Sequence, residues 1–321
     1  MISNGPLLVL ASQFVAVMIH GLAKFLETTA SVDPQQILQV RMFITLSINS
    51  LFLTIRYPKE LPLGKKSVRG LLILRSLGGI CGSAGFYYSL QYLPLADATT
   101  LNLLAPLGAS LVTTKRLTLI QIGSIAICFL GVVLITKPSF ITDLLYYNNG
   151  YDPQKTWNPQ SRQGLACAMI GVLGGVCAYS SIFKIGTRSH PLVTTNCFAT
   201  GILIVSSVCF AAAPGVNFNF NLGLLQWSIM GCIGLSGTFM EYLLTAGLSD
   251  EGHGYAVHMI YCQVVLALVA DWLIWHTIPD VTSGMGAVLI IQAVYVIQRY
   301  RHREDDIVDI EMAPYTRILD H

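Results

Sequence analysis

The sequence predicts an all-α integral membrane protein whose ten transmembrane helices form two inverted five-helix repeats. Of the 321 residues, 53% are hydrophobic and only 11% are charged, whereas soluble domains carry about 25% charged residues. Apolar runs of membrane-spanning length recur along the chain. The runs fall into two groups of five, which predicts the repeat.

Each apolar run is long enough to cross about 30 Å of hydrocarbon at 1.5 Å per residue. The runs cover residues 5–26, 35–56, 68–91, 95–114, 118–136, 163–186, 191–213, 224–247, 252–275 and 281–300. They are continuous, unlike the alternating segments of about ten residues in a membrane β-barrel. No Lys or Arg precedes the first run, which is longer than the apolar region of a signal peptide, so we predict a retained helix.

Lysine and arginine divide the loops between two sides of the membrane. With the N-terminus in the cytosol, one side holds Arg56, Lys59, Lys65, Lys66, Arg69, Lys115, Arg116, Lys184, Arg188, Arg299, Arg301, Arg303 and Arg317. The other side holds only Lys24, Lys137, Lys155 and Arg162. Because cytosolic loops are enriched in Lys and Arg, we predict that both termini are cytosolic.

A polar segment separates the two groups of runs. Residues 137–162 carry Pro, Asn, Gly and charged residues, which is typical of a linker. We predict a first five-helix half at 1–136, a non-cytosolic linker at 137–162, a second half at 163–300 and a cytosolic tail at 301–321. Because five is odd, the second half must enter the membrane inverted relative to the first, as in many secondary transporters.

The sequence resembles the EamA-type branch of the drug/metabolite transporter superfamily, relatives of the nucleotide-sugar and triose-phosphate translocators. The resemblance is carried by "RSLGGICGSAGFYYSLQYLPLADATTLNLLAPLGAS" and "RLTLIQIGSIAICFLGVVLI". In addition, "GFYYSLQYLPLAD" (85–97) is weakly similar to "TFMEYLLTAGLSD" (238–250) in the second half. The resemblance implies a secondary-active transporter that moves a small organic solute or metabolite by alternating access.

The fourth run departs from the family pattern. Pro106 is followed only by "LGASLVTTKRLT", about one helical turn short, and Lys115 stands where the family has Glu. An alternative function is therefore a non-transporting membrane scaffold or regulator, or an inactive paralogue with a shortened fourth helix. A proline inside a helix also frees the carbonyl four residues earlier. We predict that Asn102 and this carbonyl line a substrate cavity; a structural kink is the alternative.

Ionisable side chains within the runs mark further candidate binding residues, because charge inside a membrane is costly. Arg75 and Glu241 have opposite signs at similar depth, which predicts an ion pair or two sides of one site. We add His258 and Tyr87 as candidates. For Lys24 and Arg41 the expectation is that the side chains extend to the membrane interface and have no further role. The string Gly78, Gly79, Gly82, Ser83 and Gly85 predicts close helix packing.

The sequence contains no pattern that predicts an enzyme. It has no HExxH, no paired carboxylates, no dinucleotide fingerprint and no nucleotide-binding loop. We predict no catalytic residue, no cofactor, no metal and no nucleic-acid partner. The predicted partners are a small-molecule solute and the lipid bilayer, with a homodimer left open. The membrane is also left open between the plasma membrane and the ER or Golgi.

Overall fold

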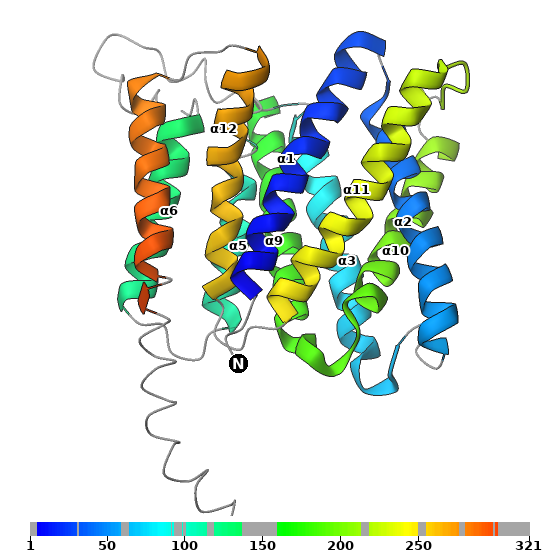
Figure 1. Ribbon diagram of the computed structural model, residues 1–321, viewed down its shortest axis with the longest axis horizontal. Coiled ribbons are helices and arrows are strands. Elements are labelled where there is room, and N and C mark those ends of the chain that lie inside the picture. The colour runs from blue at the N-terminus through cyan, green and yellow to red at the C-terminus, as the bar shows by residue number, and fades with distance from the viewer. Residues whose placement is uncertain are drawn as a thin grey trace, which may run out of the picture.

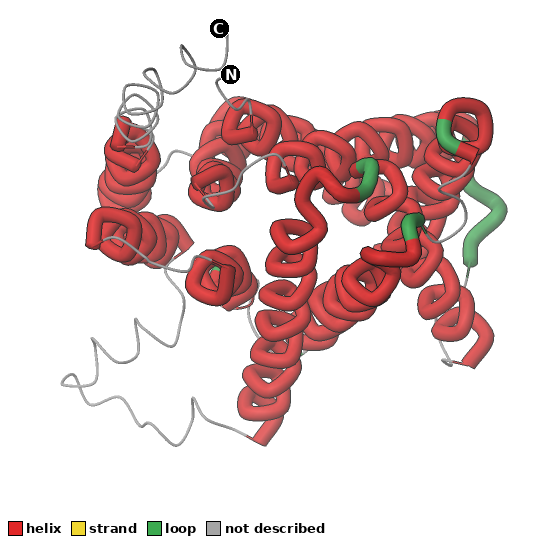
Figure 2. Tube along the Cα trace, turned by 90° about the horizontal axis from the view of Figure 1, so that it is seen from below, coloured by secondary structure: helices red, strands yellow, loops and turns green. Residues whose placement is uncertain are grey.

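Most of the part of the chain that the computed structural model describes is helical, short loops join the helices, and that part contains no strand (Figure 1 and Figure 2). The described residues are 5–30, 32–58, 64–90, 92, 98, 101–113, 119–136, 159–212, 218–249, 255–275, 280–297 and 299–300. The predicted tail and all but the last four residues of the predicted linker lie outside them.

Helices occur within every one of the ten predicted ranges. In the first half they are α1 Gly5–Ala30, α2 Pro34–Arg56, η2 Lys66–Val68, α3 Arg69–Leu90, α5 Leu104–Thr113 and α6 Leu119–Thr136. In the second half they are α9 Pro159–Ile185, η4 Gly186–Arg188, α10 Pro191–Ala212, α11 Leu224–Ser249, η5 Tyr255–Tyr261, α12 Cys262–Trp275 and an unlabelled helix, Val281–Ile297. The last four residues of the predicted linker therefore belong to α9.

The helices have the length and composition of membrane spans. Six of them are long and apolar enough to cross a bilayer, and Ala256–Ala270 and Val281–Ile297 are shorter apolar helices. Large apolar side chains are exposed on the outside of the bundle, as on α1, where Leu7, Phe14, Met18 and Phe25 are 45–67% exposed. Such a surface fits lipid. The protein is an all-α, multi-pass membrane protein, and the count of ten crossings stays a prediction.

The contacts between helices repeat when the two halves are exchanged. α1 packs on α11, and its counterpart α9 packs on α3. α2 packs on α11, as α10 packs on α3, and α2 and α10 also pack on each other. α5 packs on α9, as η5 and α12 pack on α1. This exchange pattern is what a two-fold relation between inverted five-helix halves produces.

Residue contacts show the direction of these pairs. Gly78 lies against Gly174 and Ala178, whereas Gly85, further along α3, lies against Gly171 and Cys167. α3 and α9 are therefore antiparallel. Gly247, near the end of α11, lies against Gly5 and Val9, at the start of α1, so α1 and α11 are antiparallel too. In Figure 1, α1 begins and Val281–Ile297 ends at the same, lower end of the bundle.

Local sequence fixes where α2 begins. Asp33 is extended and its side chain accepts a hydrogen bond from the backbone nitrogen of Gln35 at 2.8 Å, while Pro34 occupies the first turn. An N-cap aspartate and an early proline are both favourable there, because the first-turn N–H groups lack intrahelical partners. This start fixes the register of the helix that brings Arg41 into the bundle.

Candidate functional site

A polar face of α2 points into the bundle. Arg41, Thr45 and Asn49 follow at intervals of four residues, which places them on one side of the helix. The Thr238 hydroxyl of α11 donates to Thr45 Oγ1 at 3.0 Å, and Asn49 Nδ2 donates to Thr195 Oγ1 of α10 at 2.8 Å. This face of α2 therefore contacts two helices of the second half, α10 and α11.

Three charged side chains meet beside this face, and we call them the Arg–Glu–Arg cluster: Arg41 of α2, Glu241 of α11 and Arg75 of α3. Arg41 Nη2 lies 3.3 Å from Glu241 Oε1, and Arg75 Nη2 lies 3.7 Å from Glu241 Oε2. The three side chains are 14%, 10% and 7% exposed in the order Arg41, Glu241, Arg75. Two guanidinium groups share one carboxylate, so the cluster has a formal charge of +1.

The inverted arrangement brings Arg75 and Glu241 to one depth. Arg75 lies soon after the start of α3 at Arg69, and Glu241 lies shortly before the end of α11 at Ser249. At 1.5 Å per residue both are on the order of 10 Å from the same end of the bundle. The predicted juxtaposition of Arg75 and Glu241 is confirmed by their ion pair.

Glycines and an aromatic ring shape the space around the arginines. A Cβ atom on Gly79 would lie 2.5 Å from Arg75 Nη1, and one on Gly237 would lie 2.5 Å from Arg41 Nε. Both positions therefore need glycine if the guanidinium groups are to stay where they are. The Arg75 guanidinium also lies over the Phe198 ring of α10, 4.4 Å from its centroid, a cation–π arrangement.

The fourth and ninth segments, which are counterparts in the repeat, both begin irregularly. A turn at Leu103 precedes α5, and the 3₁₀ segment η5 precedes α12. The two irregular points touch, because the buried Tyr261 hydroxyl donates to the Leu103 carbonyl at 3.2 Å. Interrupted helices at equivalent positions of two repeats are where transporters commonly build their binding sites.

The structure changes the expectation for Pro106. α5 begins at Leu104, so Pro106 lies in its first turn and not in a helix interior. Leu101 and Asn102 are also helical, so the segment is interrupted at Leu103, three residues before Pro106, and both the cavity and the structural kink stay predictions. The interruption is the turn at Leu103, and the backbone carbonyl that receives a side-chain hydrogen bond there is that of Leu103.

The other predicted site residues are placed as follows. Asn102 is exposed and directly precedes the turn. His258 is 2% exposed and lies in η5, beside the buried Val257 and Met259. Tyr87 belongs to α3, but its side chain is not among the described parts. Neither Asn102 nor His258 belongs to the Arg–Glu–Arg cluster, and the role of all three residues in binding stays a prediction.

Solvent reaches the inward side of α1 at His20. His20 is exposed, although it follows the exposed Met18 by two residues and is therefore rotated by about 200° from the lipid-facing side. Its Nδ1 lies 3.4 Å from Nε2 of Gln263 on α12. An exposed histidine on this side indicates an accessible space between α1 and α12 within the bundle.

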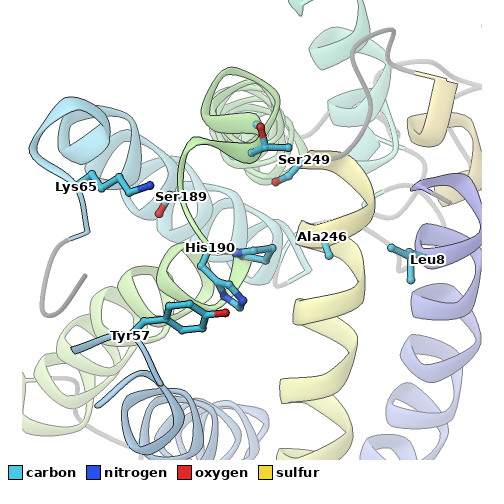
Figure 3. Close-up of a pocket in the computed structure, with 10 residues that line it drawn as sticks. Leu8, Tyr57, Lys65, Ser189, His190, Ala246 and Ser249 are labelled. Atoms are coloured by element: carbon cyan, nitrogen blue, oxygen red, sulfur yellow. The ribbon is translucent and has the colours of Figure 1, made fainter. Parts of the chain in front are cut away.

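A pocket of about 390 Å³ opens at the end of the bundle that is predicted to face the cytosol. Helix ends and the segments that join them form it, and its lining includes Leu8, Tyr57, Lys65, Ser189, His190, Ala246 and Ser249 (Figure 3). The His190 ring lies 4.8 Å from the Tyr57 ring and 6.4 Å from the Tyr242 ring, measured between centroids. Tyr242 directly follows Glu241 on α11, so the aromatic row runs from two residues that line the pocket to a residue next to the cluster.

The expectation for Arg41 is wrong. Its side chain does not extend to the membrane interface, because Glu241 and the space left by Gly237 hold it inside. The spacing of Arg41, Thr45 and Asn49 was a signal that could have revealed this, since polar residues four apart share one helix face. Tyr261 and Phe198 were also missed, because one aromatic residue in an apolar helix gives no pattern.

A family model described as "EamA-like transporter family" matches residues 4–137 and 164–299. The chain belongs to this family. The matched ranges cover most of the sequence and leave out the segment between the halves and the C-terminal tail. The chain is therefore a multi-pass membrane protein of a transporter family, in agreement with the resemblance seen in the sequence.

Individual relatives agree with this assignment. The chain is 33% identical to "Probable transporter vicT" of Bipolaris victoriae over 94% of this chain and 88% of that one. It is 22% identical to "Pseudopaline exporter CntI" of Pseudomonas aeruginosa over 93% and 97% of the respective chains. A crystal structure with 16% identity matches 93% of this chain and 99% of its own with a TM-score of 0.70, which shows the fold alone.

Proposed function

We propose that this protein is a secondary-active transporter that moves a small organic solute across a membrane by alternating access. The observation that carries the proposal is the exchange pattern of contacts between the halves, with the two interrupted segments meeting at Tyr261 and Leu103. Such a pair of halves can rock about a site between them and expose it to either side in turn. The Arg–Glu–Arg cluster is the charged part of the proposed site.

Two features support alternation between two openings. His20 is reached by solvent on the inward side of α1, in the part of the helix predicted to be non-cytosolic. At the opposite end, the pocket is lined by Tyr57 and His190, and the His190 ring lies beside that of Tyr242. This conformation then corresponds to a state whose cytosolic side is closed, and the aromatic row would separate in the opposite state.

Uptake into proteoliposomes tests the proposal. Pools of labelled sugars, amino acids, organic acids and nucleosides are offered to vesicles with and without the protein. We expect saturable uptake of at least one pool, accelerated when the same solute is present inside, because an exchanging carrier returns faster when loaded. Uptake of no pool would favour the scaffold alternative, and uptake without saturation or acceleration would contradict alternating access.

A matched pair of variants links transport to the pocket. Ser249→Trp places a large ring in the pocket mouth, whereas Ser228→Trp places the same ring at an exposed position of the same helix. We expect Ser249→Trp to reduce uptake at least tenfold and Ser228→Trp to leave it within twofold. Equal uptake by both variants would show that the solute does not pass through this pocket.

A further inference from the structure

The Arg–Glu–Arg cluster has more positive than negative charge. Arg41 and Arg75 both pair with Glu241, and the ion pairs that join them contain that single carboxylate. A guanidinium group does not lose its proton in a protein, and uncompensated charge at membrane depth is costly. One further anionic group in the cluster would bring its formal charge to zero.

The arginines also have hydrogen-bond donors to spare. Nε of Arg41 and Nε of Arg75 are buried, and neither has a hydrogen-bond acceptor among the described atoms; Oε2 of Glu241 is also buried without a donor, so the cluster has two donors without partners for one such acceptor. Buried polar atoms are nearly always hydrogen-bonded in native structures. Donors that are buried without acceptors, on two cations that face one carboxylate, are typical of a site whose ligand brings the missing acceptors.

The pairing inside the cluster is loose. The two nitrogen–oxygen distances are 3.3 and 3.7 Å, whereas charge-assisted hydrogen bonds between such groups are about 2.7–2.9 Å long. Glu241 is thus held between the two guanidinium groups without a tight, two-pronged pair to either. A second carboxylate can take one guanidinium group while Glu241 keeps the other.

We propose that the cluster binds the carboxylate of a small organic acid, and that this acid is the transported solute. The inference rests on the proposed function and specifies its substrate class. A carboxylate is the favoured anion because the two guanidinium groups already pair with one carboxylate, that of Glu241. Each guanidinium group presents a planar fork of donors that matches two carboxylate oxygens.

Polar side chains connect the cluster with both ends of the bundle. Toward the end predicted to be non-cytosolic, the inward side of α1 carries His20, whose Nδ1 lies 3.4 Å from Nε2 of Gln263 on α12. Toward the other end, Thr245 and Ser249 follow Glu241 at four-residue intervals on α11, and Ser249 lines the pocket. The Thr245 hydroxyl is buried and has no hydrogen-bond partner among the described atoms. The organic acid can therefore meet polar groups on either side of the cluster.

Binding measurements test the substrate class. Acetate, succinate and citrate are added to the purified protein at constant ionic strength, alongside the uncharged acetamide and succinamide. We expect at least one acid to raise the apparent melting temperature, because a ligand that binds the folded state stabilises it, and we expect the amides to have no effect. Stabilisation by the amides as strong as by the acids, or by none of the acids, would overturn the proposal.

Two conservative substitutions locate the site. Arg75→Lys keeps the charge but removes the planar fork, and we expect it to weaken binding of the stabilising acid at least tenfold. Arg56→Lys makes the same change at the exposed end of α2 and should leave the affinity within twofold. Equal affinities in the two variants would place the acid elsewhere and refute the assignment to the cluster.

Chemical rescue provides a readout that a purely structural ion pair would not give. Glu241→Ala removes the carboxylate and leaves space beside two guanidinium groups. We expect acetate to raise the apparent melting temperature of Glu241→Ala by several degrees more than that of the unchanged protein, with acetamide ineffective. Equal shifts in both proteins would count against a carboxylate site. If this variant cannot be purified, Arg75→Lys still decides the question.

Transport separates the two proposals. Uptake of uncharged solutes alone would refute the organic-acid inference and leave the transporter proposal standing. Binding of an acid at the cluster without uptake of any solute would refute transport and leave the carboxylate site standing. Uptake of the stabilising acid, reduced at least tenfold in Arg75→Lys and unchanged in Arg56→Lys, would support both.

Discussion

The α3–α9 contact and the α1–α11 contact each join one half of the protein to the other, and they are equivalent when the two halves are exchanged. They are nevertheless built from different atoms. Between α3 and α9, backbone lies on backbone: a Cβ on Gly78 would be 2.8 Å from the Ala178 nitrogen, and one on Gly174 would be 2.5 Å from the Gly82 nitrogen. Between α1 and α11, backbone meets backbone at Gly247, which lies against Gly5 and Val9. Further along the pair, side chains fill the space, with Ile19, Leu26, Met230 and Ile233 in one buried cluster.

The difference has a mechanical consequence. A backbone contact has no rotatable groups and cannot adapt when the helices shift, whereas side chains can change rotamer while staying packed. We therefore expect α3 and α9 to move as one rigid pair and α1 to slide or tilt on α11. The Arg–Glu–Arg cluster joins Arg75 of the first pair to Glu241 of the second, so it is where such movements would be felt.

The largest expected effect comes from breaking the cluster, which joins the α3–α9 helix pair to the α1–α11 helix pair. Glu241→Gln leaves two buried guanidinium groups without a carboxylate, and breaking a buried ion pair by removing one partner costs about 3–5 kcal/mol. Arg75→Ala should cost less, since Glu241 keeps Arg41. Thermal unfolding in detergent measures both, and the double variant should lose less than the sum of the singles, because the residues interact.

A control distinguishes this loss from a general effect of removing a carboxylate. Asp280→Asn makes the matching change at an exposed helix cap, where Asp280 Oδ1 accepts from the Val281 nitrogen at 2.7 Å. Asparagine keeps an oxygen that can accept this bond and caps a helix about as well as aspartate, so we expect a change within about 0.5 kcal/mol. If Glu241→Gln were equally mild, or if Arg75 and Glu241 contributed additively, the cluster would not couple the two pairs.

The second expectation concerns the backbone contact. Gly174→Val places a branched side chain against Gly78 and Gly82 of α3, and because neither backbone can yield, we expect a loss of about 3 kcal/mol. Gly231→Ala is the matched control on α11, since an added Cβ there meets no atom within 4 Å. It should be neutral or stabilising by up to about 1 kcal/mol. Similar melting temperatures for both variants would abolish the proposed difference between the pairs.

The sequence allowed much of this architecture to be predicted. Apolar runs gave the positions of the helices, and the glycines of α3 predicted the close packing that Gly78, Gly82 and Gly85 make with α9. Arg75 and Glu241 were matched by depth and sign alone. These predictions succeed because burial in lipid restricts backbone and charge severely.

Other features could not be predicted because they depend on which helices meet. The partner of the Tyr261 hydroxyl lies more than 150 residues away, at Leu103, and no local pattern indicates it. Pro106 suggested a kink, but the proline pattern alone does not say whether it lies within a helix or in its first turn. Arg41 was assigned to the interface because a long charged side chain can reach it, and its actual partner, Glu241, belongs to the other half of the chain.

The third expectation tests the side-chain contact between α1 and α11. Leu26 is fully buried, and Leu26→Ala should cost about 2 kcal/mol, near the low end for such changes. The loss is low because lipid tails are as apolar as the protein core, so removing apolar atoms from the core costs little transfer free energy. Most of the loss then comes from the cavity that the smaller side chain leaves. Leu26→Met keeps the volume and should cost less than about 1 kcal/mol. A loss in Leu26→Met as large as in Leu26→Ala would indicate that α1–α11 is as unyielding as α3–α9.

The smallest expected effect lies where the interrupted segments of the two halves meet. Tyr261→Phe removes the hydroxyl that binds the Leu103 carbonyl and keeps the ring, so we expect a loss of about 1 kcal/mol. Tyr88→Phe is the control, because Tyr88 is 54% exposed on α3 and should change stability by less than about 0.5 kcal/mol.

The rate of uptake by the same two variants tests whether the bond differs between the transport states. If the bond holds the halves together in one state only, its removal shifts the balance between states, and a loss of about 1 kcal/mol changes that ratio about fivefold. We therefore expect uptake by Tyr261→Phe to change severalfold in rate while Tyr88→Phe transports normally. Unchanged uptake would show that the bond persists in both states and that the two halves part elsewhere.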